Sequence, residues 1–159
     1  MSSDHFTGKR RLNFSIILVS TTRTLKDDES GNDLEAMLKP FANEIRRDSS
    51  HDDPNEILAS LERSISESDI IVFVGGTGPS RYDLTSATVR RIADKEIRGF
   101  GELFRMRSGT DFAYLSDASM FVCSGRIVYT IPGSPNAMKT ASDIIIGLSD
   151  HALHEVNKE

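Results

Sequence analysis

The segment of this chain best suited to chemistry is the glycine loop, Gly75-Gly76-Thr77-Gly78-Pro79-Ser80. It follows the apolar run of residues 70–74, which is typical of a strand buried on both faces of a parallel sheet. Ligands of open α/β sheets bind beyond the carboxyl ends of strands, and glycines there let successive backbone N–H groups approach an anion. The loop therefore indicates a phosphate site, while a tight turn with positive φ explains the same glycines. It is neither a Walker A loop nor the GxGxxG dinucleotide fingerprint.

A second loop with ligand-binding character is Pro132-Gly133-Ser134-Pro135, which also follows an apolar run and precedes a helical pattern. The Ser134 hydroxyl and the N–H groups of the first helical turn can bind a phosphate. An N-cap at Ser134, with proline at the first helical position, explains the same residues structurally. Ser20 and Thr21 end the first predicted strand, so we expect them to form a pocket wall at the same edge of the sheet.

Alternating strands and helices must position these loops. The clearest helix start is Asp53-Pro54-Asn55-Glu56, a capping box with proline at the first helical position. Ser124-Gly125-Arg126 is typical of a tight turn in a hairpin. The predicted strands cover residues 13–19, 44–49 (a weak pattern), 70–74, 120–123 and 127–131. The predicted helices cover residues 32–40, 54–65, 85–93, 101–107 and 135–146, with a final short helix from residue 148.

This order predicts an α/β protein with three layers, α/β/α, and a mostly parallel sheet that carries an antiparallel hairpin at one edge. We expect one domain over residues 1–159, with residues 1–11 as a polar lead-in to the first strand. The apolar fraction of 38% is somewhat low for a globular protein but well above the range of disordered chains.

Composition excludes several classes of function. The net charge of −5 gives no global basic field for nucleic acid, so an anionic ligand must be held locally. Cys123 is the only cysteine, which excludes an internal disulfide and a cysteine-rich zinc site. Its apolar neighbours favour a buried small hydrophobe over a nucleophile. Because residues 1–11 do not form a signal peptide and no run reaches membrane-spanning length, we expect a cytoplasmic protein without membrane contact.

The order of these motifs resembles the molybdopterin adenylyltransferase family, the MoaB and Mog proteins of molybdenum-cofactor synthesis. The resemblance extends from Ile16 to about His151 and includes the two loops, Gly99-Phe100-Gly101-Glu102 and Asp28-Glu29-Ser30-Gly31. No single motif is specific, but the combination at these spacings is. The resemblance implies the MoaB/Mog-like fold, which also occurs as a domain of larger molybdenum-insertion proteins.

The resemblance implies a nucleotidyltransferase that uses ATP and Mg²⁺ to adenylylate molybdopterin and releases pyrophosphate. Such a protein must hold several polyanionic groups together and neutralise their charge. Mg²⁺ takes one or two carboxylates together with phosphate oxygens and water. The resemblance assigns the catalytic and metal-binding role to Asp53 and Asp83, with Asp52 as the alternative if the register differs by one residue. Both Asp53 and Asp83 also have a structural explanation as helix N-caps.

The two substrates are expected at different loops. The residues expected to bind nucleotide phosphates are Gly75, Gly76, Thr77, Gly78 and Ser80. The residues expected to bind molybdopterin are Ser20, Thr21, Gly133, Ser134 and Pro135.

This chain departs from the family pattern at three positions. Ala87 stands where glutamate is usual, Asp117 replaces the arginine of a common Ser-Arg-Ala, and Asn136 replaces an expected lysine. The loss of two cations weakens a site for polyanions. The cations that could compensate are Arg81, Arg105 and Lys139.

Three functions stay open. The two aspartates favour an active adenylyltransferase, the departures favour a catalytically weak or silent molybdopterin-binding paralogue, and the third is an oligomerisation or partner domain. The resemblance implies a homotrimer or homohexamer and allows a molybdenum-insertion protein as a partner. Phe100, Leu103, Phe104 and Met106 are expected to form an exposed apolar patch at the subunit interface.

Overall fold

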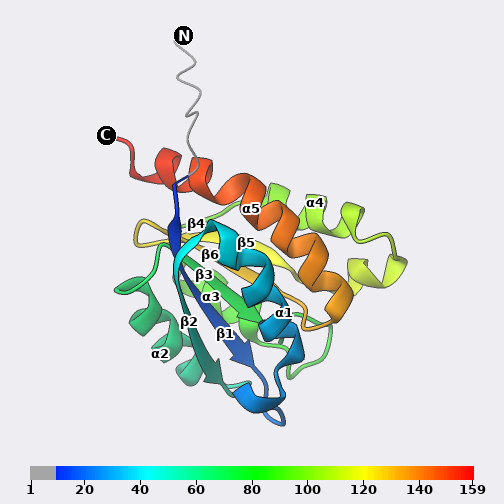
Figure 1. Cartoon of the computed structure of the whole chain (residues 1–159). Helices are drawn as coiled ribbons and strands as arrows, with labels where there is room; N and C mark the ends of the chain where they lie inside the picture. The colour runs from blue at the N-terminus through cyan, green and yellow to red at the C-terminus, as the bar shows by residue number, and fades with distance from the viewer. Residues whose placement is uncertain (1–9) are drawn as a thin grey trace.

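The computed structural model describes residues 10–159, so residues 1–9 of the expected lead-in lie outside the described residues. A six-stranded sheet forms the centre, in the order β2-β1-β3-β6-β5-β4 (Figure 1). Four strands are parallel, namely β1 (Leu12–Val19), β2 (Ala42–Ser50), β3 (Ile70–Val74) and β6 (Arg126–Ile131). Antiparallel pairing joins β5 (Ser119–Cys123) to β6 and the short β4 (Lys95–Glu96) to β5. The weakly predicted strand, β2, is confirmed at one edge of the sheet.

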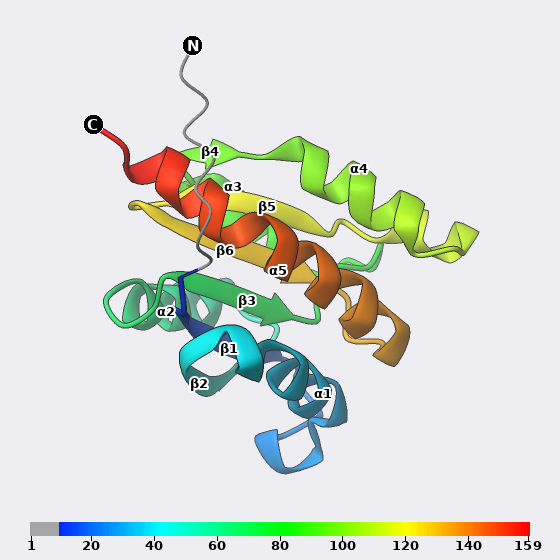
Figure 2. The same ribbon diagram turned by 45° about the horizontal axis from the view of Figure 1, so that its top comes forward.

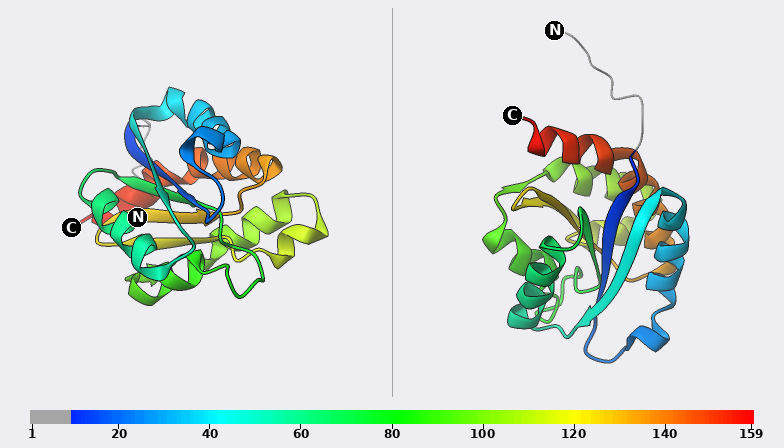
Figure 3. Two further views of the ribbon diagram at one scale, coloured as in Figure 1. Left: turned by 90° about the horizontal axis from the view of Figure 1, so that it is seen from below. Right: turned by 60° about the vertical axis from the view of Figure 1, so that its left-hand side comes forward.

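Helices cover both faces of the sheet, which confirms the predicted three layers (Figures 2 and 3). One face carries α1 (Glu29–Leu38), α4 (Arg98–Arg107) and α5 (Pro135–Asn157), and the other carries α2 (Pro54–Ile65) and α3 (Thr85–Ile92). Successive side chains of a strand point to opposite faces, so Val72 packs in the first core and Phe73 in the second. Because both faces are buried, β3 is apolar throughout. Short 3₁₀ helices cover Leu25–Asp27, Lys39–Phe41 and Asp111–Leu115.

Two helices begin where a carboxylate accepts backbone hydrogen bonds. Asp28 accepts from the N–H of Gly31, so α1 begins at Glu29, earlier than the predicted residue 32. Asp53 caps α2 by accepting from the N–H groups of Asn55 and Glu56. The Glu56 carboxylate accepts instead from the N–H of His51 at 2.9 Å, so only the first half of the predicted capping box forms.

The predicted break before a final short helix is wrong, because α5 is continuous over 23 residues. Gly147 interrupts the pattern, but its position is open, with no atom within 4 Å of the place of a Cβ. The buried face continues past it through Ser149 and Leu153, and the Ser149 hydroxyl lies 2.9 Å from that of Tyr129. Packing on the sheet therefore outweighs the cost of a helical glycine, about 1 kcal/mol.

The predicted hairpin is confirmed between β5 and β6. Its two central residues, Ser124 and Gly125, have φ values of 49° and 77°, as in the tight turns that suit twisted hairpins. The hairpin is not the outermost part of the sheet, since β4 adds two residues beyond β5. The sequence pattern did not indicate β4, which is too short to show alternation.

The expected apolar interface patch on α4 is wrong for its aromatic residues. Phe100 and Phe104 are 2% and 1% exposed and pack in the core, with the Phe100 ring 5.0 Å from that of Tyr129. Leu103 packs partly against the same core, and only Met106 is largely exposed. The oligomeric state stays a prediction. Among the helices of residues 10–159, none has the length and apolar character needed to cross a membrane.

We predict that the Cys123 thiol is inert in the folded protein. The side chain is 2% exposed, and burial, reinforced by the negative charge of Asp94, raises its pKa to about 12. Alkylation by iodoacetamide at pH 8 should be at least roughly 10²-fold slower in the native protein than in guanidinium, because the thiolate is the nucleophile. Mass spectrometry of timed samples measures both rates, and equal rates would contradict the buried placement.

We also predict that Asp53 acts on stability through capping. Asp53→Ala should lower the free energy of unfolding by about 1 kcal/mol, whereas Asp53→Asn should change it little because asparagine caps a helix about as well. Urea unfolding followed by circular dichroism measures the difference. The matched control is Asp52→Ala, which removes the neighbouring carboxylate and should change stability by less than about 0.5 kcal/mol. Wild-type stability in Asp53→Ala would contradict the capping role.

Candidate functional site

The register of the parallel strands brings four loops to one edge of the sheet. Val19 pairs with Ser50, Leu18 with Val74, and Val74 with Ile131, so these strands end at the same level. The arrowheads of β1, β2 and β3 point toward the bottom and lower right of Figure 1. The N–H of Gly75 donates to the carbonyl oxygen of Ile131 at 2.9 Å, which joins the glycine loop to β6. Open α/β sheets bind ligands at such an edge.

The glycine loop leaves no space for a side chain at any of its three glycines. Gly75 has a φ of 109°, and a Cβ there would lie 2.5 Å from the carbonyl oxygen of Val19. Gly76 has a φ of 68°, and a Cβ there would collide with the Thr85 hydroxyl and lie 3.4 Å from Oδ1 of Asp52. A Cβ on Gly78 would lie 2.7 Å from Oδ2 of Asp83. Glycine is therefore required by local geometry, and the two carboxylates flank the loop.

The Asp83 side chain stabilises the glycine loop and does not cap a helix. Its carboxylate accepts from the N–H of Ser80 at 3.0 Å, and its own N–H donates to the Ser80 carbonyl oxygen at 3.0 Å. The N-cap of α3 is Leu84, which makes no side-chain cap. The alternative explanation of Asp83 as a helix cap is therefore not observed.

Of the two neighbouring aspartates, Asp52 lies beside the glycine loop, whereas Asp53 caps α2. Asp52 accepts from the Thr21 hydroxyl at 2.7 Å and lies beside Gly76. Asp53 is engaged at the start of α2 by two backbone N–H groups. The geometry thus favours the alternative register, with Asp52 in the place that the sequence analysis gave to Asp53.

Thr85 is a site residue that the sequence analysis missed. It is 0% exposed, and its hydroxyl has no hydrogen-bond partner among the described residues. It lies beside Gly76, whose carbonyl oxygen accepts from the Thr85 N–H at 3.1 Å. Buried hydroxyls nearly always have a partner, so this one indicates a water, ion or ligand oxygen at the loop. Its place in Asp83-Leu84-Thr85, beside a carboxylate already assigned to the site, was the available signal.

Asp52 and Asp83 fit the role of the protein ligands in a magnesium site. Among the described residues no three His, Cys, Asp or Glu side chains come together as a complete metal site. Mg²⁺ in phosphate-binding sites keeps several waters and takes only one or two protein carboxylates. Asp52 and Asp83 supply two carboxylates at the loop, each oriented by a hydrogen bond.

A hollow lies between the loops after β1 and β6. Ser20, Arg23, Ser30, Gly75 and Gly133 contribute to its lining. The Ser20 hydroxyl accepts from the N–H of Arg23 at 2.9 Å, and the Ser30 hydroxyl donates to the Gly133 carbonyl oxygen at 2.7 Å. Arg23 also lines the adjoining hollow with Ser134 and Pro135, and it is the only cation lining either hollow among the described residues. Arg23 was not among the residues expected at the site.

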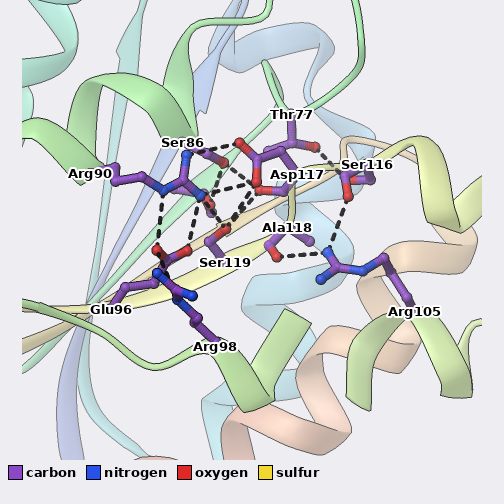
Figure 4. A network of polar contacts seen from close by, with 11 residues as sticks. Thr77, Ser86, Arg90, Glu96, Arg98, Arg105, Ser116, Asp117, Ala118 and Ser119 are labelled. Atoms are coloured by element: carbon purple, nitrogen blue, oxygen red, sulfur yellow. Dashed lines mark hydrogen bonds and ion pairs between the residues drawn. The ribbon is translucent and has the colours of Figure 1, made fainter. Parts of the chain in front are cut away.

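Arg105, Lys139 and Arg81 were expected to compensate for the cations that this chain lacks relative to the family pattern. All three contact other protein groups. Arg105 donates to the carbonyl oxygens of Ser116 and Ala118 at 3.1 and 3.2 Å (Figure 4). Lys139 lies 3.8 Å from the carboxylate of Asp143, and Arg81 donates to the Tyr82 hydroxyl at 2.6 Å. Of the departures, Asp117 pairs with Arg90 at 3.0 Å, Asn136 donates to the Ser108 carbonyl oxygen at 3.4 Å, and Ala87 is exposed.

Thr77 and Ser134 have structural roles within the two loops. Thr77 is 3% exposed and its hydroxyl lies 3.0 Å from that of Ser116, so it packs behind the glycine loop. Ser134 caps α5 by accepting from the N–H of Ala137 at 3.3 Å. Thr21 is bonded to Asp52, which joins the loop after β1 to the glycine-loop site.

Comparisons with known proteins agree on one family. The model of the probable molybdopterin binding domain matches residues 15–151. Molybdenum cofactor biosynthesis protein B of Staphylococcus epidermidis is 32% identical over 94% of this chain and 92% of its own length. The crystal structure of a molybdenum cofactor biosynthesis protein B has a TM-score of 0.88 at 30% identity and covers 96% of this chain and 99% of its own.

A second solved structure is that of the tungsten cofactor synthesizing protein MoaB from Pyrococcus furiosus. It has a TM-score of 0.83 at 31% identity and covers 95% of this chain and 100% of its own. The family model spans both loops and both flanking aspartates. The chain therefore belongs to the molybdopterin-binding-domain family that includes the MoaB proteins of molybdenum-cofactor biosynthesis.

Proposed function

We propose that this protein acts in molybdenum-cofactor biosynthesis as a nucleotidyltransferase that transfers AMP from ATP to molybdopterin. The observation that carries the proposal is the pair of oriented carboxylates, Asp52 and Asp83, on either side of a glycine loop with a buried, unpaired Thr85 hydroxyl. Such a site is suited to a metal-bound triphosphate.

The backbone of the glycine loop would bind the triphosphate. Among the described residues, the N–H groups of Gly76, Thr77 and Gly78 donate to no protein acceptor. Free N–H groups in a turn with positive φ form an anion-binding nest. Because these donors belong to the backbone, the loop can hold phosphate oxygens without a side-chain cation.

The carboxylates would fix the charge-neutralising ion relative to this loop. Mg²⁺, when bound, neutralises charge on the triphosphate and on the leaving pyrophosphate. Thr21 holds Asp52 and the Ser80 N–H holds Asp83, so neither carboxylate must be ordered when the nucleotide binds. A phosphate oxygen of molybdopterin would attack the α-phosphorus, and the bond from that phosphorus to the bridging oxygen would break. The attacking phosphate is already anionic and needs no general base.

Molybdopterin would bind in the hollow beside the nucleotide. Gly75 lines this hollow together with Ser20 and Gly133, so the two substrates would meet next to the glycine loop. The N-terminus of α5 begins beside Ser134 and favours negative charge. Arg23 would supply the positive charge that the family pattern expects from a lysine at position 136, where this chain has Asn136.

The second candidate function is a silent paralogue that binds molybdopterin without turnover. The other contacts of Arg105, Lys139 and Arg81 favour it, because a site for two polyanions then has Arg23 as its one lining cation among the described residues. The two aspartates favour the enzyme. Tight molybdopterin binding without pyrophosphate release would support the paralogue.

We predict that Gly76→Ala abolishes ATP binding while the fold persists, because its Cβ would collide with the Thr85 hydroxyl. The matched control is Gly109→Ala. Gly109 has nearly the same φ, 69° against 68°, but its position is open. Both variants should lose about 1–2 kcal/mol of stability from backbone strain, and only Gly76→Ala should lose affinity in calorimetric titration with ATP and Mg²⁺. Unchanged ATP affinity in Gly76→Ala would mean that the loop is only a turn.

We predict that Asp52→Asn and Asp83→Asn each lower the rate of pyrophosphate release by roughly 10²-fold or more, the loss typical of one positioned electrostatic group. Each amide keeps the shape and removes the charge. Asp53→Asn is the matched control beside the site and should keep wild-type turnover. If Asp53→Asn were inactive and Asp52→Asn active, the assignment of the carboxylate at the loop would be reversed.

A further inference from the structure

The segment of residues 116–119 contacts the glycine loop and α3 at the same time (Figure 4). The N–H of Asp117 donates to the carbonyl oxygen of Thr77 at 2.6 Å. The hydroxyl of Ser86, in the first turn of α3, donates to the carbonyl oxygen of Asp117 at 2.5 Å. The backbone of one residue therefore joins the glycine loop to the start of the helix that carries the unpaired Thr85 hydroxyl.

The side chain of Asp117 is fixed by Arg90, which lies further along α3. Both terminal nitrogens of Arg90 donate to the Asp117 carboxylate, at 3.0 and 3.1 Å. Arg90 also donates twice to Glu96, at 3.0 and 3.2 Å, and its guanidinium lies over the Phe121 ring. Hydrogen bonds to Glu96 and Asp117 raise the pKa of Arg90 above its ordinary value, so the guanidinium stays charged. Arg90 is thus held from two sides and anchors Asp117 to α3.

The contacts form a closed path from the glycine loop through Asp117 and Arg90 to α3 and back to the loop. The return step is the hydrogen bond from the Thr85 N–H to the Gly76 carbonyl oxygen, at 3.1 Å. The buried Thr77 side chain adds a second contact between the glycine loop and this segment, because its hydroxyl lies 3.0 Å from that of Ser116. An arginine in place of Asp117 would bring a like charge to Arg90, so the path depends on the aspartate of this chain.

We propose that the Asp117–Arg90 pair is a positioning device that sets the geometry of the glycine loop for nucleotide binding. Neither residue lines the hollow assigned to molybdopterin, so the effect is specific to the nucleotide side. The identity of the ligand rests on the proposed function, but the coupling of the pair to the loop does not.

The test uses Asp117→Asn, Arg90→Gln and the double variant that carries both changes. Each is compared with Glu96→Gln. Glu96→Gln is the matched control, because it removes a carboxylate that pairs with the same arginine through two bonds but has no contact with the glycine loop. The first readout is amide hydrogen exchange in the ligand-free protein. We expect about fivefold faster exchange at the hydrogen-bonded amides of Gly75, Ser80 and Thr85 in Asp117→Asn and Arg90→Gln, with unchanged exchange in β1 and α5. The double variant should equal either single variant, since the pair acts as a unit.

The second readout separates positioning from general destabilisation. The KM for ATP should rise about fivefold in Asp117→Asn, while the KM for molybdopterin and the values of Glu96→Gln stay at wild type. Wild-type exchange at the amides of Gly75, Ser80 and Thr85 in Asp117→Asn would overturn the inference, as would equal acceleration in β1 and α5. The exchange measurement needs no nucleotide, so it decides the inference even where ATP binding, and with it the proposed function, fails.

Discussion

The parallel pairing of β2, β1, β3 and β6 is the constraint on which the rest of the structure depends. Pairing in register makes all four strands end at one edge, and each then continues into a loop with polar or glycine residues. Asp52, Ser20, Gly76 and Gly133 come from four separate parts of the chain and meet only because of this pairing. A ligand at this edge faces backbone donors and oriented side chains, since the loops are held by buried strands that need no ligand for their order.

The sequence was most informative where burial on two faces leaves a continuous apolar run, as in β1 and β3, and where turn chemistry is local, as at Ser124 and Gly125. It failed where packing outweighs local preference. Gly147 lies inside a continuous helix, and the aromatic residues of α4 face the core because α4 packs on the sheet. The strand β4 is too short for any pattern, and α1 begins early because the buried Asp28 accepts from Gly31.

The site was predictable as a set of loops but not in its detail. Glycine content and strand order indicated the glycine loop and the Gly133 loop. The choice between Asp52 and Asp53 depends on which carboxylate turns toward Gly76, a difference of one residue that no spacing reveals. Which cations line the site also depends on contacts that form only in the folded chain. Arg105 donates its hydrogen bonds to two backbone carbonyl oxygens. Arg23 lines the hollow because the Ser20 hydroxyl accepts from its N–H and fixes the turn that precedes Arg23.

We propose that the edge of the sheet binds a nucleotide and molybdopterin together and that AMP is transferred between them there. The most direct measurement is pyrophosphate release by the wild-type protein in the presence of ATP, Mg²⁺ and molybdopterin. We expect release that requires all three and that is accompanied by the formation of adenylyl-molybdopterin. Binding of both substrates without any release of pyrophosphate would contradict it.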